Sequence, residues 1–190
     1  MKKLVVASGN KGKIKEIAEI LKDKYEVIPM KQLGFDCEIE ETGTTFYENA
    51  LIKAKAVSEA LGEDALADDS GLSVDYLGGA PGVYSARYSG EHGDDQKNNQ
   101  LILKNLEGVE NRKAKFCSSV VLYTKEGKIY HGYGETHGVI ALKEEGQNGF
   151  GYDPLFISDD LGISFGVASD EAKNSVSHRY RALVDLLQKL

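Results

Sequence analysis

The chain begins with a short apolar segment, which is followed by a segment with the apolar periodicity of a helix. This change from a strand pattern to a helix pattern limits the fold classes that the chain can adopt. Residues 3–7 have the length and β-branched content of a buried strand, which ends at Ser8-Gly9-Asn10. Apolar residues then recur on one face of a predicted helix, at Ile14, Ile17, Ala18 and Leu21. A strand that passes through a tight turn into a helix is typical of α/β proteins.

Strand and helix patterns continue to alternate along the chain. Thr45 and Glu48 have the spacing of a capping box, which predicts a second helix that runs to about Leu61. Asp69-Ser70-Gly71 is predicted to be a turn between two short strands, and Glu126-Gly127-Lys128 the turn of a hairpin. The other expected elements are strands at 25–28, 65–68, 72–76, 113–124, 128–134 and 138–142, a helix at 94–106 and a C-terminal helical region from about 170 with a break near 177.

This order of elements predicts a mixed-sheet α/β protein with two lobes. At 190 residues, folding should bury roughly 70% of the surface exposed by the unfolded chain, enough for a core without disulfides or structural metals. We find no internal repeat, low-complexity tract or long linker. The sequence therefore predicts a single two-lobed domain over residues 1–190.

Charge and composition exclude several functional classes. Thirty acidic residues against 23 basic ones give a formal charge of −7, which disfavours a general binder of nucleic acid or of anionic membranes. The longest apolar runs are four residues, too short for a membrane span or a signal-peptide core. We expect a cytoplasmic protein in which Cys37 and Cys117 are buried small apolar residues without a functional role.

Two segments have the residue types of a phosphate and metal site. Ser8-Gly9-Asn10-Lys11-Gly12-Lys13 lies where a helix begins, and helix starts favour anions, although an Asn cap with two surface lysines is an equally good interpretation. Asp68 and Asp69 follow an apolar stretch, and paired carboxylates suit Mg²⁺ and the activation of water. An ordinary Asp-Ser-Gly turn is the alternative. Glu40 and Glu41 offer further carboxylates.

Two later segments have the residue types of a base-binding site. In Gly149-Phe150-Gly151-Tyr152-Asp153-Pro154 an aromatic ring lies between glycines, where it could stack on a base or simply anchor a turn. Lys173 and Ser177-His178-Arg179 combine phosphate-binding and hydrogen-bonding groups near a helix start. A single His is more often structural than functional.

Six segments together resemble one family in order along nearly the whole chain. They are SGNKGK at 8–13, EETG at 40–43, ADDSGL at 67–72, GGAPGVYSARYSG at 78–90, GFGYDP at 149–154 and SHR at 177–179. This set resembles the inosine triphosphatase-like family of non-canonical purine nucleoside triphosphate pyrophosphatases, also described as dITP/XTP pyrophosphatases. The resemblance implies an elongated mixed β-sheet, helices that form two lobes around a central active-site cleft, and a homodimer.

The resemblance also implies a reaction. ITP, dITP and XTP would be hydrolysed to the monophosphate and pyrophosphate with Mg²⁺, which clears deaminated purines from the nucleotide pool. Asp69 would be the catalytic carboxylate and, with Glu41, a metal ligand; Glu40 and Asp68 are further candidates. The remaining implied substrate contacts are Ser8, Gly9, Asn10, Lys11, Gly12, Lys13, Lys53 and Lys173 for the phosphates, Ser70 nearby, and Phe150, Gly151, Tyr152, Asp153, His178 and Arg179 for the base.

Two other functions compete with this one. A pyrophosphatase for pyrimidine or modified nucleotides would use the same phosphate chemistry, but Phe150 and His178-Arg179 favour a purine. A nucleotide-binding sensor without catalysis would keep the lysines and the ring, yet it would not need Glu41, Asp68 and Asp69 together. Hydrolysis of a purine nucleotide is therefore the leading hypothesis.

Overall fold

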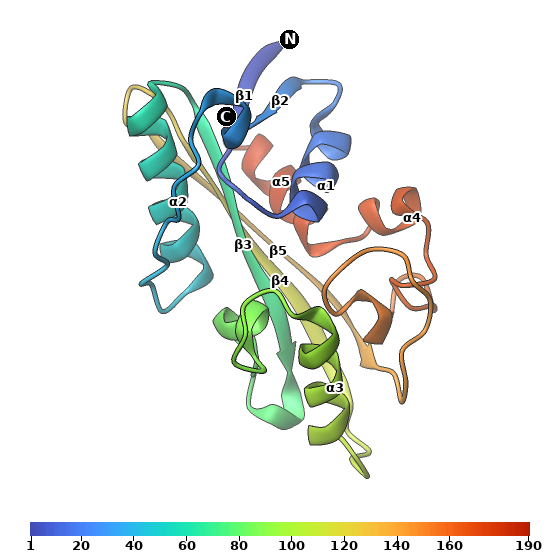
Figure 1. Cartoon of the computed structure of the whole chain (residues 1–190). Coiled ribbons are helices and arrows are strands. Elements are labelled where there is room, and N and C mark those ends of the chain that lie inside the picture. The colour runs from blue at the N-terminus through green and yellow to red at the C-terminus, as the bar shows by residue number, and fades with distance from the viewer. The chain divides into compact units, whose positions relative to one another are not determined.

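A computed structural model describes all 190 residues and contains one six-stranded sheet in the order β2-β1-β3-β4-β5-β6. Strand β1 is parallel to β2 and β3, whereas β5 and β6 are antiparallel, so the mixed-sheet α/β prediction is confirmed (Figure 1). The strands are β1 Lys2–Val6, β2 Tyr25–Pro29, β3 Ala65–Val74, β4 Lys113–Tyr123, β5 Ile129–Ile140 and β6 Phe156–Ser158. The α-helices are α1 Lys11–Leu21, α2 Phe46–Leu61, α3 Asp95–Asn105, α4 Asp170–Asn174 and α5 His178–Leu187. None of the helices combines the length and apolar character needed to span a bilayer.

The chain divides into two compact units, and each draws on segments that are distant in sequence. Unit 1 comprises Met1–Asp69, Ser118–Gly134 and Arg179–Leu190, and unit 2 comprises Ser70–Cys117 and Glu135–His178. Strands β3, β4 and β5 therefore each contribute residues to both units. The expectation of a single domain over residues 1–190 stays a prediction.

Unit 1 has a hydrophobic core on each face of its part of the sheet. Leu66 of β3 packs with residues of α1 and α5, whereas its neighbours Ala65 and Ala67 pack with α2. Successive side chains of a strand point to opposite faces, so β3 alternates between these two cores. This alternation fixes which helices Asp68 and Asp69, the next residues of the strand, can reach.

Unit 2 has a core of its own that is rich in aromatic rings. Phe116 of β4 lies 4.5 Å from the ring of Phe156 and 6.1 Å from that of Phe165. Leu72 from β3 and Ile102 from α3 belong to the same buried cluster. These contacts fix the strands and helix that surround the predicted base-binding loop.

The ends of the helices follow the predicted capping signals. Thr45 accepts a hydrogen bond from the Glu48 backbone N–H at 3.1 Å, and α2 stops at Gly62, whose φ of +67° suits glycine. The Glu48 carboxylate returns to the N–H of Thr44 at 2.6 Å rather than to that of Thr45, so the capping box is shifted by one residue. The predicted interruption of the C-terminal helical region near Ser177 is also present, since α4 ends at Asn174 and α5 begins at His178.

Two predicted breaks in the sheet were wrong. Strand β3 is continuous from Ala65 to Val74 through Asp69-Ser70-Gly71, and β5 is continuous where we expected separate strands at 128–134 and 138–142. In β3 the buried carboxylates have partners on other elements, so the strand needs no local turn to satisfy them. Two glycines of β5 lie against neighbouring backbone: a side chain at Gly132 would collide with α5, and one at Gly138 with β6.

Candidate functional site

The segment between β1 and α1 forms the cap of the helix. Asn10 accepts a hydrogen bond from the Lys13 backbone N–H at 3.1 Å, and its own N–H donates to Ser8 Oγ at 3.1 Å. Lys11 is exposed, and the adjacent Gly9 and Gly12 carry no side-chain group. The capping interpretation of Asn10 is therefore confirmed, and it leaves the helix start accessible for an anion.

Asp68 is buried in a network of protein partners. Its Oδ2 lies 2.9 Å from Lys13 Nζ and 3.3 Å from Arg179 Nη2, and Ser118 Oγ donates to Oδ1 at 2.5 Å. Burial alone would raise the pKa of Asp68, but the charges of Arg179 and Lys13 and the bond from Ser118 hold that pKa well below its ordinary value. Both carboxylate oxygens are engaged by the protein, so this residue is a poor candidate for a metal ligand.

Asp69 has a different environment on the opposite face of β3. Lys53 of α2 places its ammonium 3.7 Å from Asp69 Oδ1 and 3.2 Å from Glu41 Oε1, and donates to the Asp68 carbonyl at 2.8 Å. Asp69 is 6% exposed, and its buried Oδ2 has no hydrogen-bond partner. Burial raises the pKa of Asp69, and Glu41 and Asp68 add to that rise against the opposing charges of Lys53 and Lys13.

The residues present fit a divalent cation in part. Asp69 Oδ1 and the partly exposed carboxylate of Glu41 lie near the same Lys53 ammonium, and Asp69 Oδ2 has no hydrogen-bond partner. Two carboxylates suffice for Mg²⁺, which otherwise keeps water and phosphate ligands. The chain has no group of three or more acidic, His or Cys side chains placed to hold a metal by themselves. Glu40, the other predicted candidate, is exposed.

The predicted base-binding loop is a closed turn around Asp153. Asp153 Oδ2 accepts from the Phe150 N–H at 3.1 Å and from Lys173 Nζ at 2.5 Å, and that ammonium also lies 4.8 Å from the centre of the Phe150 ring. Gly149 has a φ of +73°, and any side chain there would collide with the Asp153 carboxylate. Lys173 is 3% exposed, so its position is with the aromatic loop rather than on an open phosphate-binding surface.

His178 and Arg179 are adjacent in sequence but have separate partners. The His178 ring stacks on Phe116 in unit 2, with ring centres 4.8 Å apart and planes inclined by 17°. The Arg179 guanidinium forms ion pairs with Glu16 and Asp68 in unit 1. Burial by itself lowers the pKa of Arg179, but the two carboxylates more than reverse that effect. Arg179 is predicted to contact the base, but these contacts favour a role as the ion-pair partner of Glu16 and Asp68.

Sequence reasoning missed two residues of this network. Glu16 is buried in the middle of α1, and Ser118 is buried in β4. Neither lies in a recognisable motif: one is an isolated acid on a helix and the other a serine in an apolar strand. Their roles come only from Arg179 and Asp68, which are remote in sequence.

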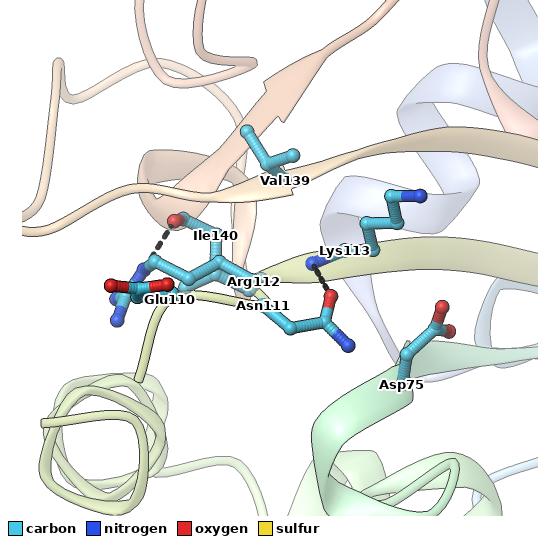
Figure 2. A pocket seen from close by; sticks show the side chains of 7 residues that line it. All are labelled: Asp75, Glu110, Asn111, Arg112, Lys113, Val139 and Ile140. Atoms are coloured by element: carbon cyan, nitrogen blue, oxygen red, sulfur yellow. Dashed lines mark hydrogen bonds between the residues drawn. The ribbon is translucent and has the colours of Figure 1, made fainter. Parts of the chain in front are cut away.

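A cavity in unit 2 contains none of the predicted site residues. It has a volume of about 720 Å³ and belongs entirely to unit 2. Figure 2 shows its lining, in which the Arg112 guanidinium is turned toward the Ile140 carbonyl. All three guanidinium nitrogens of Arg112 donate to backbone carbonyls, so this cation serves the fold. The lining residues are Asp75, Glu110, Asn111, Arg112, Lys113, Val139 and Ile140.

Comparison with known proteins gives full-length matches. The model of the Ham1 family matches residues 4–189. The dITP/XTP pyrophosphatase of Haemophilus influenzae is 48% identical over 193 residues, and the match covers 99% of this chain and 98% of that protein. The Bacillus subtilis protein of the same name is 47% identical over 195 residues, and the match covers 100% of this chain and 98% of that protein. The solved Ham1 protein of Staphylococcus aureus is 41% identical with a TM-score of 0.85 and covers 99% of this chain and 97% of its own. That of Coxiella burnetii is 37% identical with a TM-score of 0.87 and full coverage of both chains.

Proposed function

Because the chain belongs to the Ham1 family, we propose that it hydrolyses non-canonical purine nucleoside triphosphates, namely dITP, ITP and XTP, to the monophosphate and pyrophosphate. The observation that carries this proposal is the 47–48% identity, over the whole chain, to proteins named dITP/XTP pyrophosphatase. Asp69 supports it independently, because a buried carboxylate with a raised pKa and an unpartnered oxygen is suited to proton transfer.

Asp69 is the proposed catalytic carboxylate. It orients the attacking water and accepts its proton while the water oxygen bonds to the α-phosphorus and the bond from that phosphorus to the α–β bridging oxygen breaks. Pyrophosphate leaves with the electron pair of the broken bond. Lys53, in contact with Asp69 and Glu41, holds the two carboxylates near each other before the substrate binds.

Magnesium is part of the same proposal. Glu41 and Asp69 would hold the ion, which when bound would screen the polyphosphate and stabilise the leaving pyrophosphate. Asp68 is left out of this ligand set because its oxygens are already bound by Lys13, Arg179 and Ser118. Its proposed role is to hold Lys13 in place.

The phosphates are bound by the start of α1 together with two lysines. Backbone N–H groups near Ser8 and Asn10 and the ammonium groups of Lys13 and Lys53 attract the triphosphate. Lys173, first expected among the phosphate contacts, is assigned to the base loop instead, since its ammonium is engaged by Asp153 and the Phe150 ring.

The base is bound by the aromatic loop and its neighbours. Phe150 stacks on the purine, and Asp153, His178 and nearby backbone groups match the 6-keto edge of hypoxanthine or xanthine. Adenine presents an amino group at that position, which leaves a donor of the site unpaired. Sites that require such a match reject the wrong base by about 10⁴–10⁵-fold, which explains why ATP would be excluded.

Product analysis tests the proposed reaction. The purified protein is incubated with ITP, dITP, XTP, GTP and ATP, with Mg²⁺ and with a chelator, and pyrophosphate is measured separately from orthophosphate. We expect metal-dependent pyrophosphate from the first three nucleotides and little from ATP, or from GTP, which shares the 6-keto group and is distinguished by its 2-amino group. Orthophosphate as the product would contradict attack at the α-phosphorus, and nucleotide binding without turnover would favour a sensor.

Removal of the stacking ring is a second test. Phe150→Ala should raise the KM for ITP about 5- to 150-fold, because stacking on one base contributes about 1–3 kcal/mol. The kcat should change less, since the carboxylates are untouched. Steady-state kinetics measures both, and Tyr76→Ala, which removes an exposed ring elsewhere in unit 2, is the matched control. An unchanged KM in Phe150→Ala would contradict stacking.

A cytoplasmic location and a homodimer belong to the proposal on the strength of the family resemblance. Light scattering on the eluting chromatographic peak measures the mass in solution. A mass near 20.7 kDa, that of one chain, would contradict the dimer.

A further inference from the structure

Helix α3 binds both backbone polar groups of Gly151, the residue that follows Phe150. Asp95 Oδ2 accepts from the Gly151 N–H at 3.0 Å, and Asn99 Nδ2 donates to the Gly151 carbonyl at 3.1 Å. Asp95 and Asn99 are four residues apart, so they lie on the same face of the helix. One turn of α3 therefore fixes the peptide group on each side of Gly151.

Gly151 is a residue that needs such an anchor. Its φ is +60°, which suits glycine, and a side chain there would meet nothing within 4 Å, so side-chain packing does not hold this position. The turn already ties Phe150 to Asp153, because the Phe150 N–H donates to the Asp153 carboxylate and the Asp153 N–H donates to the Phe150 carbonyl. The bonds from Asp95 and Asn99 hold the two peptide groups that flank Gly151, and their loss would loosen the chain directly after Phe150 and with it the orientation of the ring.

A second anchor lies one residue further along the loop. The Tyr152 hydroxyl donates to the Ser85 carbonyl at 2.6 Å, and Ser85 Oγ accepts from the Leu72 N–H of β3 at 2.9 Å. Asn98 of α3 donates to the Ala86 carbonyl at 3.2 Å and accepts from the Ser89 N–H at 2.8 Å. The Gly-rich segment 78–90, which has no part in the proposed chemistry, thus supports the loop together with α3.

We infer that Asp95 and Asn99 are positioning residues for the nucleotide base: by holding both peptide groups of Gly151 they keep the Phe150 ring in the orientation that stacks on the purine. The inference rests on the proposed stacking by Phe150. Asp95 and Asn99 act through the backbone of Gly151 and need not touch the nucleotide. Removing either should therefore weaken base binding and leave the carboxylate chemistry intact.

The main test separates the hydrogen bond from the charge of Asp95. Asp95→Ala loses both, whereas Asp95→Asn loses only the charge and keeps an oxygen that accepts from Gly151. We expect the KM for ITP to rise about tenfold in Asp95→Ala and less than about twofold in Asp95→Asn, with kcat within about threefold of wild type in both. Gln100→Ala, an exposed change on the same helix, is the control and should leave the KM unchanged. Equal effects of Asp95→Ala and Asp95→Asn would overturn the inference.

A substitution at Asn99 that keeps the size of the side chain tests the second hydrogen bond independently. Asn99→Asp replaces the amide donor by an oxygen that faces the carbonyl of Gly151 and the carboxylate of Glu144. We expect a rise in the KM at least as large as in Asp95→Ala, about tenfold or more. An unchanged KM would remove Asn99 from the proposal.

A double-mutant cycle shows whether Asp95 acts through Phe150. In the Phe150→Ala background, Asp95→Ala should raise the KM further by less than about twofold, because the ring that it positions is already absent. Inhibition by inorganic triphosphate, which has no base, should be unchanged in Asp95→Ala, whereas a general structural defect would weaken it.

The outcomes distinguish this inference from the proposal on which it depends. If Phe150→Ala raises the KM and Asp95→Ala does not, the positioning role is wrong and the stacking proposal stands. If Phe150→Ala leaves the KM unchanged, the stacking proposal itself is wrong. A full tenfold effect of Asp95→Ala in both backgrounds, or a parallel loss of inhibition by triphosphate, would overturn the positioning role.

Discussion

Replacing Asp69 by asparagine is expected to lower kcat by about 10²–10⁴-fold while the nucleotide still binds. The asparagine keeps the size of the side chain but cannot accept the proton of the attacking water. Lys53 and Glu41 remain in place, and the asparagine keeps one oxygen that can face the metal, so the nucleotide should still bind. Single-turnover kinetics with ITP measures the loss, and calorimetric titration with an ITP analogue that has a non-hydrolysable α–β bridge measures binding.

Asp69→Asn has two controls: its own free energy of unfolding, and a substitution at a surface site. Because burial raises the pKa of Asp69, ionisation of this carboxyl at neutral pH opposes folding, and the neutral amide should leave the free energy of unfolding unchanged or higher. Asp23→Asn, an exposed change in unit 1, should leave kcat unaffected. A kcat close to that of wild type in Asp69→Asn would remove Asp69 as the catalytic carboxylate.

The raised pKa of Asp69 also predicts the direction of the pH dependence. A base with a raised pKa becomes protonated at a higher pH on acidification, so kcat/KM should begin to fall well above pH 3.8, the ordinary value for this side chain. This acidic limb should be absent from the residual activity of Asp69→Asn. The pH profile of kcat/KM for wild type and variant checks both statements, and an identical limb in the two proteins would assign it to another group.

The second large effect is expected on stability, from Asp68→Ala. Removal of this carboxylate takes one ion-pair partner from the buried Arg179, which keeps its pair with Glu16, and the partner of the half-buried Lys13 ammonium. Loss of one member of a buried charge network costs about 3–5 kcal/mol of the free energy of unfolding. Urea denaturation measures this loss. Activity should fall as well, because Lys13 loses the group that holds it.

A surface pair supplies the comparison for Asp68→Ala. Glu19→Ala breaks an exposed pair with Lys15 on α1 and should change the free energy of unfolding by less than about 1 kcal/mol. If Asp68 were chiefly a metal ligand, its alanine variant would lose activity with stability close to that of the wild type. That result would reverse the division of roles between Asp68 and Asp69 proposed above.

Asp68 should also contribute to the acid sensitivity of the fold. Its pKa is lower in the folded protein than in the unfolded chain, so its stabilising contribution is fully present above the unfolded value, near 3.8, and is lost as the pH falls through the folded value. Asp68→Ala should therefore show a smaller loss of stability between about pH 4 and pH 2 than wild type. Urea denaturation at several pH values measures the difference.

The features that the sequence predicted most accurately are those that depend on residues close together in the chain. The caps at Asn10 and Thr45 are satisfied by residues three positions ahead, so the signal and its partner lie in the same short segment. The mixed sheet followed from the period of each segment and from the order of the segments. The family resemblance added the reaction, which no local pattern determines.

What the sequence could not predict depends on partners that are remote in the chain. Asp68 and Asp69 looked like a pair that shares one metal at a turn, but the strand continues through them and sends their side chains to opposite faces. Arg179 lies 111 positions from Asp68, and no spacing rule connects them. His178 and Arg179 also look like one motif in the sequence, but in the structure they contact different elements. The sequence does not show this, because their partners are remote in the chain.

The placement of α5 in unit 1 has a consequence for the order in which a newly made chain can fold. This helix contributes Leu183 and Leu186 to the core that contains β1, and its second residue, Arg179, is a charge partner of Asp68. All three residues follow β1 at a great distance in the chain, so a growing chain exposes an unfilled apolar face, and leaves Asp68 without its guanidinium partner, until α5 has been made. A chain that stops before His178 would lack this helix, and quality-control proteases would recognise it as unfolded.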